Sequence, residues 1–251
     1  MRGHGIYAGF SAVARDRVLP TPDRLPELPS LFDPVVALRE GGDALAHAVE
    51  LAPSRGAGTL VWVSAYARAE AAVVLEPEMP LAPARLAFHA AASALVDALA
   101  TLGPPEVGVG LKWPGTAVVN LGECGRVRLL APANTAEDAV PDWLVVGMEL
   151  RLAFPTGYEA GQAPNVTSLA EEGFEHAGPA EITVAWARHL MAGLDEWGAR
   201  GPQRVAERYL ARLLDEADRP GLRRGIDPDT GALVLENPDG ARERLALPVA
   251  A

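Results

Sequence analysis

Residues 83–102 constrain the fold more than any other stretch of this chain. They are rich in alanine, and five of them recur at the spacing of one helix face: Leu86, Ala90, Ser93, Ala94 and Asp97. Apolar residues almost encircle this predicted helix, and the Gly-Pro pair that follows it is a stop signal. A helix that is apolar on nearly every side has to be buried. We therefore expect residues 83–102 to form a central helix that other elements of the same domain cover.

Segments rich in β-branched and aliphatic residues stand on both sides of this helix. They predict strands at residues 59–64, 71–76, 107–111, 116–121, 125–130 and 143–153, and two further segments predict helices at residues 181–197 and 202–216. In the first two strands, Leu60, Trp62, Val73 and Leu75 form the expected core side. Strands clustered around one helix, with more helices after them, indicate an α+β fold.

A proline-rich segment separates the N-terminus from the folded part of the chain. Residues 19–29 cannot form a regular helix or a central strand, so we expect residues 1–27 to be a flexible tail. After this segment, Asp33 and Pro34 are the residue types that favour a helix start, at the N-cap and at the first helical position. We therefore expect the first helix of the domain to begin there.

One domain and one short appendage account for the rest of the chain. At 251 residues with 49% hydrophobic content, the chain can bury one large core, whereas two independent domains would be cramped. We assign residues 28–216 to this domain. Turn signals at residues 227–229 and 237–240 predict a short C-terminal β segment over residues 217–251.

The charge and the single cysteine narrow the partners and the compartment. With 22 Lys and Arg against 33 Asp and Glu, the net charge is −11. Nucleic-acid affinity rests on clustered Lys and Arg, so we expect no nucleic-acid partner. No apolar run approaches the roughly 20 residues that cross a bilayer, so we expect no membrane segment. Cys124 cannot form an intrachain disulfide, and a cytoplasmic location is expected.

Lys112 stands on a tight apolar turn between two predicted strands. Pro114-Gly115 supplies the turn signal, and Leu111 and Trp113 flank the lysine. A partly desolvated ammonium needs an anionic partner such as a carboxylate or a phosphate. The simpler alternative, which the spacing alone favours, is a lysine stem that lies over Trp113 with its charge in water.

Further segments occur in the order of one known family. Lys112-Trp113-Pro114, with the β-run that ends at Asn120, resembles the Lys-Trp-Pro-Asn-Asp segment of the biotin and lipoate protein ligases. The other resembling segments are residues 54–62 (a shortened arginine-rich loop), 142–150 (the Gly-x-Gly-x-Asn strand), 165–173 (the Thr-Ser-Leu segment) and 224–236 (the C-terminal hairpin). The resemblance extends from about residue 28 to the C-terminus, and it is to a divergent branch of the family with no assigned reaction.

The resemblance implies a fold, a reaction and a set of site residues. The fold is a mixed sheet packed on helices, and the reaction is ATP-dependent adenylation of a biotin- or lipoate-like carboxylic acid, followed by transfer to a carrier-protein lysine. Magnesium would accompany ATP. Lys112 would be catalytic, holding first the carboxylate and then the adenylate phosphate. The implied ligand contacts are Arg55, Gly56, Gly58, Trp62, Trp113, Pro114, Gly115, Asn120 and Gly147. No metal-ligand motif occurs, so no residue is assigned to a metal.

Several positions depart from the family's pattern. Gly115-Thr116 replaces its Asn-Asp pair, Glu123 stands where lipoate ligases carry a lysine, and Arg151 lies near the last position of Gly-x-Gly-x-Asn. A carboxylate that faces an adenylate phosphate would oppose its binding. Two hypotheses therefore remain open. The chain is an ATP-dependent ligase or acyltransferase of this family, or a non-catalytic module that binds a ligand or a carrier on the same scaffold.

The last predicted helix carries arginines at four-residue spacing. Arg200, Arg204, Arg208 and Arg212 would share one face of that helix. The simpler interpretation is a solvated face with Glu207 and Glu216 beside it. The alternative is a docking strip for an acidic partner, such as a biotinyl- or lipoyl-carrier domain.

Overall fold

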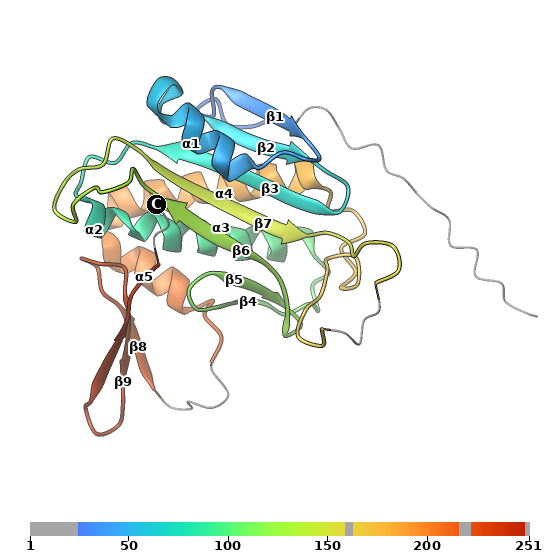
Figure 1. Cartoon of the computed structure of the whole chain (residues 1–251). Coiled ribbons are helices and arrows are strands. Elements are labelled where there is room, and N and C mark those ends of the chain that lie inside the picture. Colours follow the sequence, from blue (N-terminus) through green and yellow to red (C-terminus); the bar gives the residue numbers. More distant parts are fainter. Residues whose placement is uncertain (1–24, 159–162, 216–221, 249–251) are drawn as a thin grey trace, which may run out of the picture.

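A seven-stranded sheet lies at the centre of the computed structural model, which describes residues 25–158, 163–215 and 222–248 (Figure 1). Most of the predicted N-terminal tail lies outside these ranges. The strands are β1 Val35–Arg39, β2 Leu60–Ser64, β3 Arg68–Leu75, β4 Val109–Lys112, β5 Thr116–Val119, β6 Gly122–Leu130 and β7 Leu144–Arg151. Their order is β1-β2-β3-β7-β6-β5-β4, with β1 parallel to β2 and all other pairs antiparallel. The sheet is thus mixed, as the resemblance implied.

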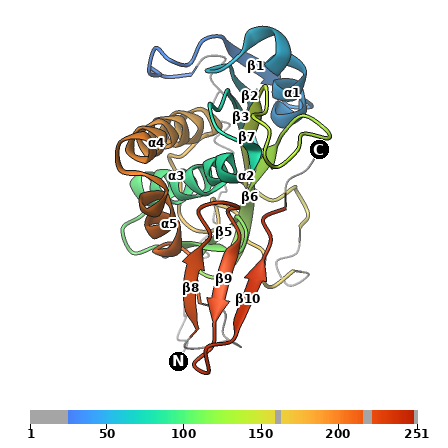
Figure 2. The same cartoon turned by 90° about the vertical axis from the view of Figure 1, so that its left-hand side faces the viewer.

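The helices divide unequally between the two faces of the sheet. One face carries α2 Leu81–Ala84, α3 Leu86–Leu102, α4 Pro179–Arg200 and α5 Pro202–Leu210, and the other carries α1 Ala44–Arg55. Figure 2 shows the sheet nearly edge-on, with α3, α4 and α5 on one side and α1 on the other. We call these the helical face and the open face. The α+β prediction is confirmed.

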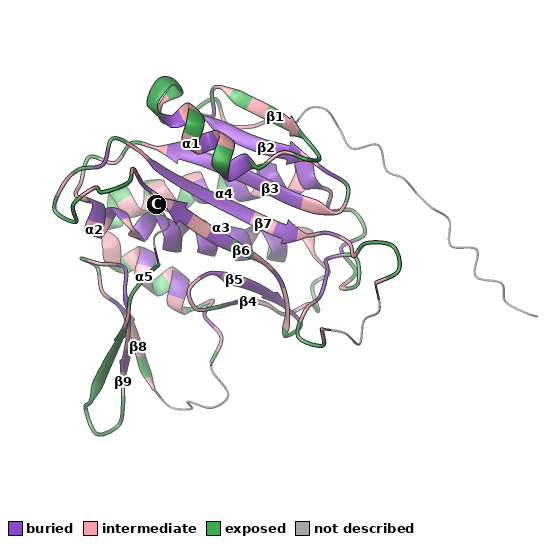
Figure 3. Cartoon of the chain, viewed as in Figure 1, coloured by how far each residue is buried: buried purple, intermediate pink, exposed green. Residues whose placement is uncertain are grey.

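The predicted central helix is α3, and it is buried almost all round (Figure 3). By length and composition alone, the run Leu81–Leu102 is apolar enough to cross a bilayer, but 72% of that window is buried inside the protein. Its apolar surface is covered by the sheet on one side and by α4 and α5 on the other. The run is therefore the core helix of the domain.

Successive side chains of a strand point to opposite faces of the sheet, and each face has its own hydrophobic core. Leu60, Trp62 and Val73 are buried in the large core under α3 and α4, which confirms the predicted core side. The residues between them, Val61 and Val63, belong to a smaller core beneath α1. The strand periodicity therefore decides which side chains meet which helix.

The predicted helix start at Asp33 and Pro34 is wrong, because a strand follows them. The β-branched pair Val35-Val36 opens β1, which pairs in parallel with β2 and so satisfies its backbone groups there. The first helix, α1, begins ten residues later at Ala44. Asp43 is its N-cap, since its carboxylate accepts a hydrogen bond of 2.8 Å from the Ala46 amide.

A second, three-stranded sheet forms the C-terminal appendage. It consists of β8 Arg223–Ile226, β9 Leu233–Glu236 and β10 Arg242–Leu245, in the antiparallel order β10-β9-β8. Leu233 and Leu235 are buried and join the large core. The ring of His89, on α3, forms a hydrogen bond of 2.8 Å through Nε2 with the carbonyl oxygen of Gly231. The appendage is therefore fixed to the helical face of the domain.

Candidate functional site

A polar cavity lies on the open face of the sheet, where α1 does not cover it. Its volume is about 560 Å³, and its lining includes the ends of β1 and β7 and the beginnings of β3, β5 and β6. Six charged side chains line it: Glu40, Arg68, Glu123, Arg126, Glu149 and Arg151. We call it the open-face cavity. Its size suits a small organic ligand, and its charge suits a polar or ionic one.

Strand register explains why these charges gather in one place. Thr116 on β5 lies opposite Arg126 on β6, Arg126 lies opposite Glu149 on β7, and Glu149 lies opposite Glu70 on β3. Residues in register across neighbouring strands point to the same face of a sheet. Arg126 donates to Oε2 of Glu149 through Nε at 3.2 Å and through Nη2 at 3.0 Å. This ion pair forms part of the cavity lining.

Arg68, which lines the cavity, pairs with Glu70 beside the start of α1. Nε of Arg68 lies 3.0 Å from Oε2 of Glu70, and its Nη2 donates to the Gly42 carbonyl at 2.6 Å. Glu70 is 7% exposed, and its Oε1 accepts a bond of 2.6 Å from the Ala44 amide at the first turn of α1. A carboxylate at a helix N-terminus is stabilised by the free amides there. The pair therefore fixes α1 to β3.

Lys112 is not itself a lining residue, but its carboxylate partner Glu123 is, so the lysine lies beside the cavity at what we call its rim. It ends β4 opposite Thr116, and its Nζ donates to Oε1 of Glu123 at 2.8 Å. The side chains of Lys112 and Glu123 are 46% and 42% exposed. The anionic partner that we expected for a partly desolvated lysine is therefore Glu123 of the same chain. Glu123 faces the cavity, so its charge acts on any ligand bound there.

The rest of the Lys-Trp-Pro turn packs on the helical face. Trp113 lies beside the rings of His89 and Tyr209, with centroids 5.8 and 6.1 Å away. The hydroxyl of Tyr209 donates to the carbonyl oxygen of Pro114 at 2.5 Å. A Cβ atom on Gly115 would lie 2.5 Å from the Phe88 ring. Trp113, Pro114 and Gly115 therefore hold the turn in place, and they do not line the cavity.

Burial determines the ionisation of the aromatic cluster beneath the turn. His89 is fully buried, and desolvation lowers its pKa from 6.5 to about 4, against the smaller opposing effect of its hydrogen bond to Gly231. Its Nδ1 has no partner among the described residues. Burial also raises the pKa of the Tyr209 hydroxyl. At neutral pH both groups are uncharged, and their role is to pack and to hydrogen-bond.

Two other predicted ligand contacts have structural roles. Oδ1 of Asn120, at the end of β5, accepts from the Gly108 amide at 3.1 Å, and its Nδ2 donates to Glu172 at 2.7 Å. Gly147, in the middle of β7, lies under α1, where a Cβ atom would come 2.6 Å from Leu45. Asn120 therefore fixes a loop, and Gly147 allows α1 to approach the sheet.

The predicted contacts Arg55, Gly56, Gly58 and Trp62 are not brought together with Lys112. Arg55 ends α1, and Gly56 and Gly58 follow with φ of 74° and 84°, which glycine adopts without strain. They precede β2 and adjoin the end of β3, whereas the open-face cavity lies at the beginning of β3. Trp62 is 1% exposed, in the core of the helical face. The expected single pocket is thus not what the structure forms.

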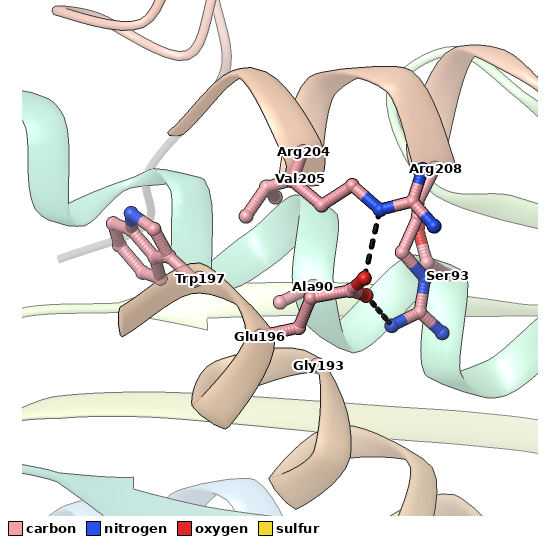
Figure 4. A pocket seen from close by; sticks show the side chains of 8 residues that line it. All are labelled: Ala90, Ser93, Gly193, Glu196, Trp197, Arg204, Val205 and Arg208. Carbon is pink, nitrogen blue, oxygen red and sulfur yellow. Dashed lines mark hydrogen bonds and ion pairs between the residues drawn. The ribbon is translucent and has the colours of Figure 1, made fainter. Parts of the chain in front are cut away.

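The arginine strip is an ion-pair network between helices. Glu196 on α4 accepts from Arg204 at 2.8 Å and from Arg208 at 2.9 Å, as Figure 4 shows. Asp97 on α3 accepts from Arg208 at 2.7 Å and from Arg212. The Arg208 side chain is 20% exposed. Both interpretations given to the sequence, a solvated face and a docking strip, therefore miss the main role of Arg204, Arg208 and Arg212, which is to hold α5 against α3 and α4.

The described residues contain neither a cluster of three metal ligands nor a reactive thiol. No group of three or more His, Cys, Asp or Glu there is arranged to hold a metal ion. The thiol of Cys124 is buried, and burial raises its pKa to about 12, so it is protonated at neutral pH. Its Sγ lies 3.6 Å from the Ala117 carbonyl. Cys124 is therefore a core residue.

Sequence reasoning missed four charged residues of the cavity: Glu40, Arg68, Arg126 and Glu149. The signal was present, because Arg126 and Arg128 alternate on β6 and Glu149 and Arg151 alternate on β7. Charge at every second residue of an otherwise apolar strand marks a face that no helix covers. Which of these charges share a cavity depends on strand order, which the pattern does not contain.

The sequence matches the family model described as the biotin/lipoate A/B protein ligase family over residues 28–211. A biotin--[acetyl-CoA-carboxylase] ligase from Paracoccus denitrificans is 32% identical over 215 residues, which cover 79% of this chain and 86% of that protein.

Solved structures agree with these matches. A biotin protein ligase-like protein of unknown function from Silicibacter sp. TM1040 superposes with a TM-score of 0.75 at 30% identity, covering 89% of this chain and 97% of that one. The biotin protein ligase of Aquifex aeolicus in complex with biotin and ATP gives a TM-score of 0.64 at 13% identity, covering 86% of this chain and 97% of that one. The second likeness shows the fold alone.

Proposed function

We propose that this chain, which belongs to the biotin/lipoate A/B protein ligase family, uses ATP to activate a biotin- or lipoate-like carboxylic acid and transfers the acyl group to a lysine of a carrier protein. The observation that carries the proposal is the open-face cavity of about 560 Å³, with Lys112 at its rim. The Paracoccus relative is named as a biotin ligase of acetyl-CoA carboxylase, and the Aquifex ligase is described with biotin and ATP. These names indicate which ligands to test first.

The proposed reaction has two steps. An oxygen of the acid's carboxylate attacks the α-phosphorus of ATP, the bond between the α- and β-phosphates breaks, and pyrophosphate leaves. The lysine amine of the carrier then attacks the acyl carbon of the adenylate, AMP leaves, and the nitrogen loses a proton to form the amide. Negative charge gathers on phosphate oxygens in both steps, so fixed cations beside them favour the reaction.

The residues of the cavity fit an anionic ligand. Lys112, Arg68, Arg126 and Arg151 supply positive charge at or near its walls. Magnesium would enter with the phosphates of ATP, because Mg²⁺ is held mainly by substrate phosphates, waters and one or two carboxylates. Glu40, Glu123 and Glu149 are the lining carboxylates available to it. When the ligand binds, the ion pair between Lys112 and Glu123 would break, and Lys112 would pair with the ligand's charged oxygens instead.

Pyrophosphate release tests the proposed function directly. The full chain is incubated with Mg-ATP and, separately, with biotin, lipoate or octanoate, and pyrophosphate and acyl-adenylate are measured. One of the three acids should stimulate pyrophosphate release, and addition of an acceptor carrier domain should yield an acylated lysine by mass spectrometry. Lys112→Ala should lose most of this activity. The proposal fails if none of the acids stimulates release.

The second candidate is a binding module that holds the acid without activating it. The ion pair between Lys112 and Glu123 favours it, because the carboxylate neutralises the lysine and repels phosphate. The same samples separate the two functions. A module binds an acid or a carrier domain with no pyrophosphate release, whereas a ligase shows both.

A further inference from the structure

The cations in and beside the open-face cavity differ in whether they form an ion pair with a carboxylate of the chain. Arg126 is paired with Glu149, Arg68 with Glu70, and Lys112 at the rim with Glu123. Arg151 is different, since within the described parts of the chain it forms hydrogen bonds to backbone carbonyls and no ion pair with a carboxylate. Among the arginines that line the cavity, Arg151 is the one that forms no ion pair with a described carboxylate.

The guanidinium of Arg151 is also held in a fixed position. Its Nη1 donates to the carbonyl oxygen of Glu123 at 3.3 Å and to that of Thr167 at 3.0 Å, and its Cζ lies 5.5 Å from the centre of the Phe154 ring. These contacts come from three different segments of the chain. A side chain that is already ordered loses little entropy when it binds a ligand.

Donors remain on this guanidinium for a ligand. Arginine carries five N–H donors, and the contacts of Arg151 within the described residues use Nη1 alone. Nε and Nη2 form the edge that binds a carboxylate or a phosphate through two parallel hydrogen bonds. Arg151 lines the cavity, and it is half-buried, so competition from water is reduced.

We propose that Arg151 is the anchor for the anionic group of the ligand in the open-face cavity, and that it binds a carboxylate or phosphate oxygen pair. Lys112 then acts as a second, exchangeable cation, because its charge is shared with Glu123. This inference rests on the proposed function, because it takes the open-face cavity as the ligand site. It adds that Arg151 selects a ligand with a negative charge. Octanoate, a carboxylate without phosphate, and pyrophosphate, a phosphate without carboxylate, distinguish the two sources of the anion.

Calorimetry on the full chain tests the anchor with three variants. The wild type should bind at least one of the two probes, and Arg151→Gln should bind it about tenfold to a hundredfold more weakly, because two charge-assisted hydrogen bonds are lost. Arg151→Lys keeps the charge but loses the planar fork, so its affinity should be intermediate. Arg223→Gln, which removes an arginine 87% exposed on the appendage, should bind as the wild type does.

A nuclear magnetic resonance measurement keeps the test decisive if Arg151→Gln fails to fold. The Nε–H resonance of Arg151, assigned by its absence from Arg151→Lys, should shift when the probe is added to the wild type. The inference is overturned if neither probe binds the wild type, if Arg151→Gln binds as tightly as the wild type, or if the resonance stays in place while the probe binds. Pyrophosphate release separates the two proposals: binding through Arg151 without release refutes only the ligase function, and release with unchanged affinity in Arg151→Gln refutes only the anchor.

Discussion

The hydroxyl of Tyr209, on α5, donates a hydrogen bond to the carbonyl oxygen of Pro114, in the turn that follows Lys112. Tyr209 is fully buried, and its ring lies 4.3 Å from that of His89 between centroids. The rim lysine on the open face is therefore positioned by packing on the helical face. A substitution that removes this hydrogen bond should therefore alter the position of Lys112.

Tyr209→Phe should lower the free energy of unfolding by about 1–2 kcal/mol, because it leaves the partly buried carbonyl oxygen of Pro114 without its donor. Urea denaturation followed by circular dichroism measures the change. Tyr66→Phe is the matched control, since Tyr66 is 56% exposed and should lose less than about 0.5 kcal/mol. Equal stability of the two variants would show that the Tyr209 hydroxyl does not hold the turn.

Arg208→Gln should destabilise the fold by about 1–3 kcal/mol, since it removes partly buried pairs with Asp97 and Glu196 at once. The midpoint of urea denaturation should fall at unchanged slope. Arg200→Gln should change little, because that side chain is 67% exposed and lies 3.4 Å from Glu196. If Arg208→Gln kept full stability but lost salt-sensitive binding to a carrier domain, the docking interpretation would be restored.

The secondary structure was largely predictable, because buried helices and strands carry apolar residues at a regular spacing in the sequence. The central helix, the six predicted strands and the core side of β2 follow from apolar spacing, and the structure has them within a few residues. The exception is β1, where two residues that favour a helix start, Asp33 and Pro34, precede a strand. Pairing with β2, far along the chain, outweighed that local preference.

The candidate site was much less predictable, because it depends on pairs distant in sequence. Helical spacing placed Arg208 and Arg212 on one face but gave no information on Asp97, 111 and 115 residues away, which accepts from both. In the same way, Arg126 and Glu149 share the cavity only because β6 lies beside β7. The resemblance identified Lys112, but its neighbours in the structure come from strand order.

His89 should make stability depend on pH in the acidic range. Its pKa is lowered in the folded state from 6.5 to about 4, so between these values the unfolded chain binds a proton that the folded chain does not. Its contribution is fully present above pH 6.5 and is lost as pH falls toward 4, by about 3 kcal/mol in total. His89→Gln should remove this part of the pH dependence, whatever its stability at pH 7. Urea denaturation at pH 7 and pH 5 measures the slope, and His176→Gln, at an exposed histidine, should keep it.

Glu123 should weaken anion binding in the wild type, so its removal should strengthen it. The carboxylate lines the cavity and lies 2.8 Å from Nζ of Lys112, where it both repels a ligand's anionic oxygens and occupies the lysine. Both side chains are nearly half exposed, so solvent screening limits the gain to about 1 kcal/mol, or about fivefold in affinity. Glu123→Gln should therefore bind pyrophosphate or octanoate more tightly than the wild type by calorimetry. The gain should disappear in the double variant Lys112→Ala/Glu123→Gln if it comes from the freed lysine, and persist if it comes from lost repulsion alone. Glu78→Gln, at an exposed glutamate between β3 and α2, controls for the change in net charge. Equal affinity of Glu123→Gln and Glu78→Gln for both probes would mean that Glu123 does not act on the ligand site.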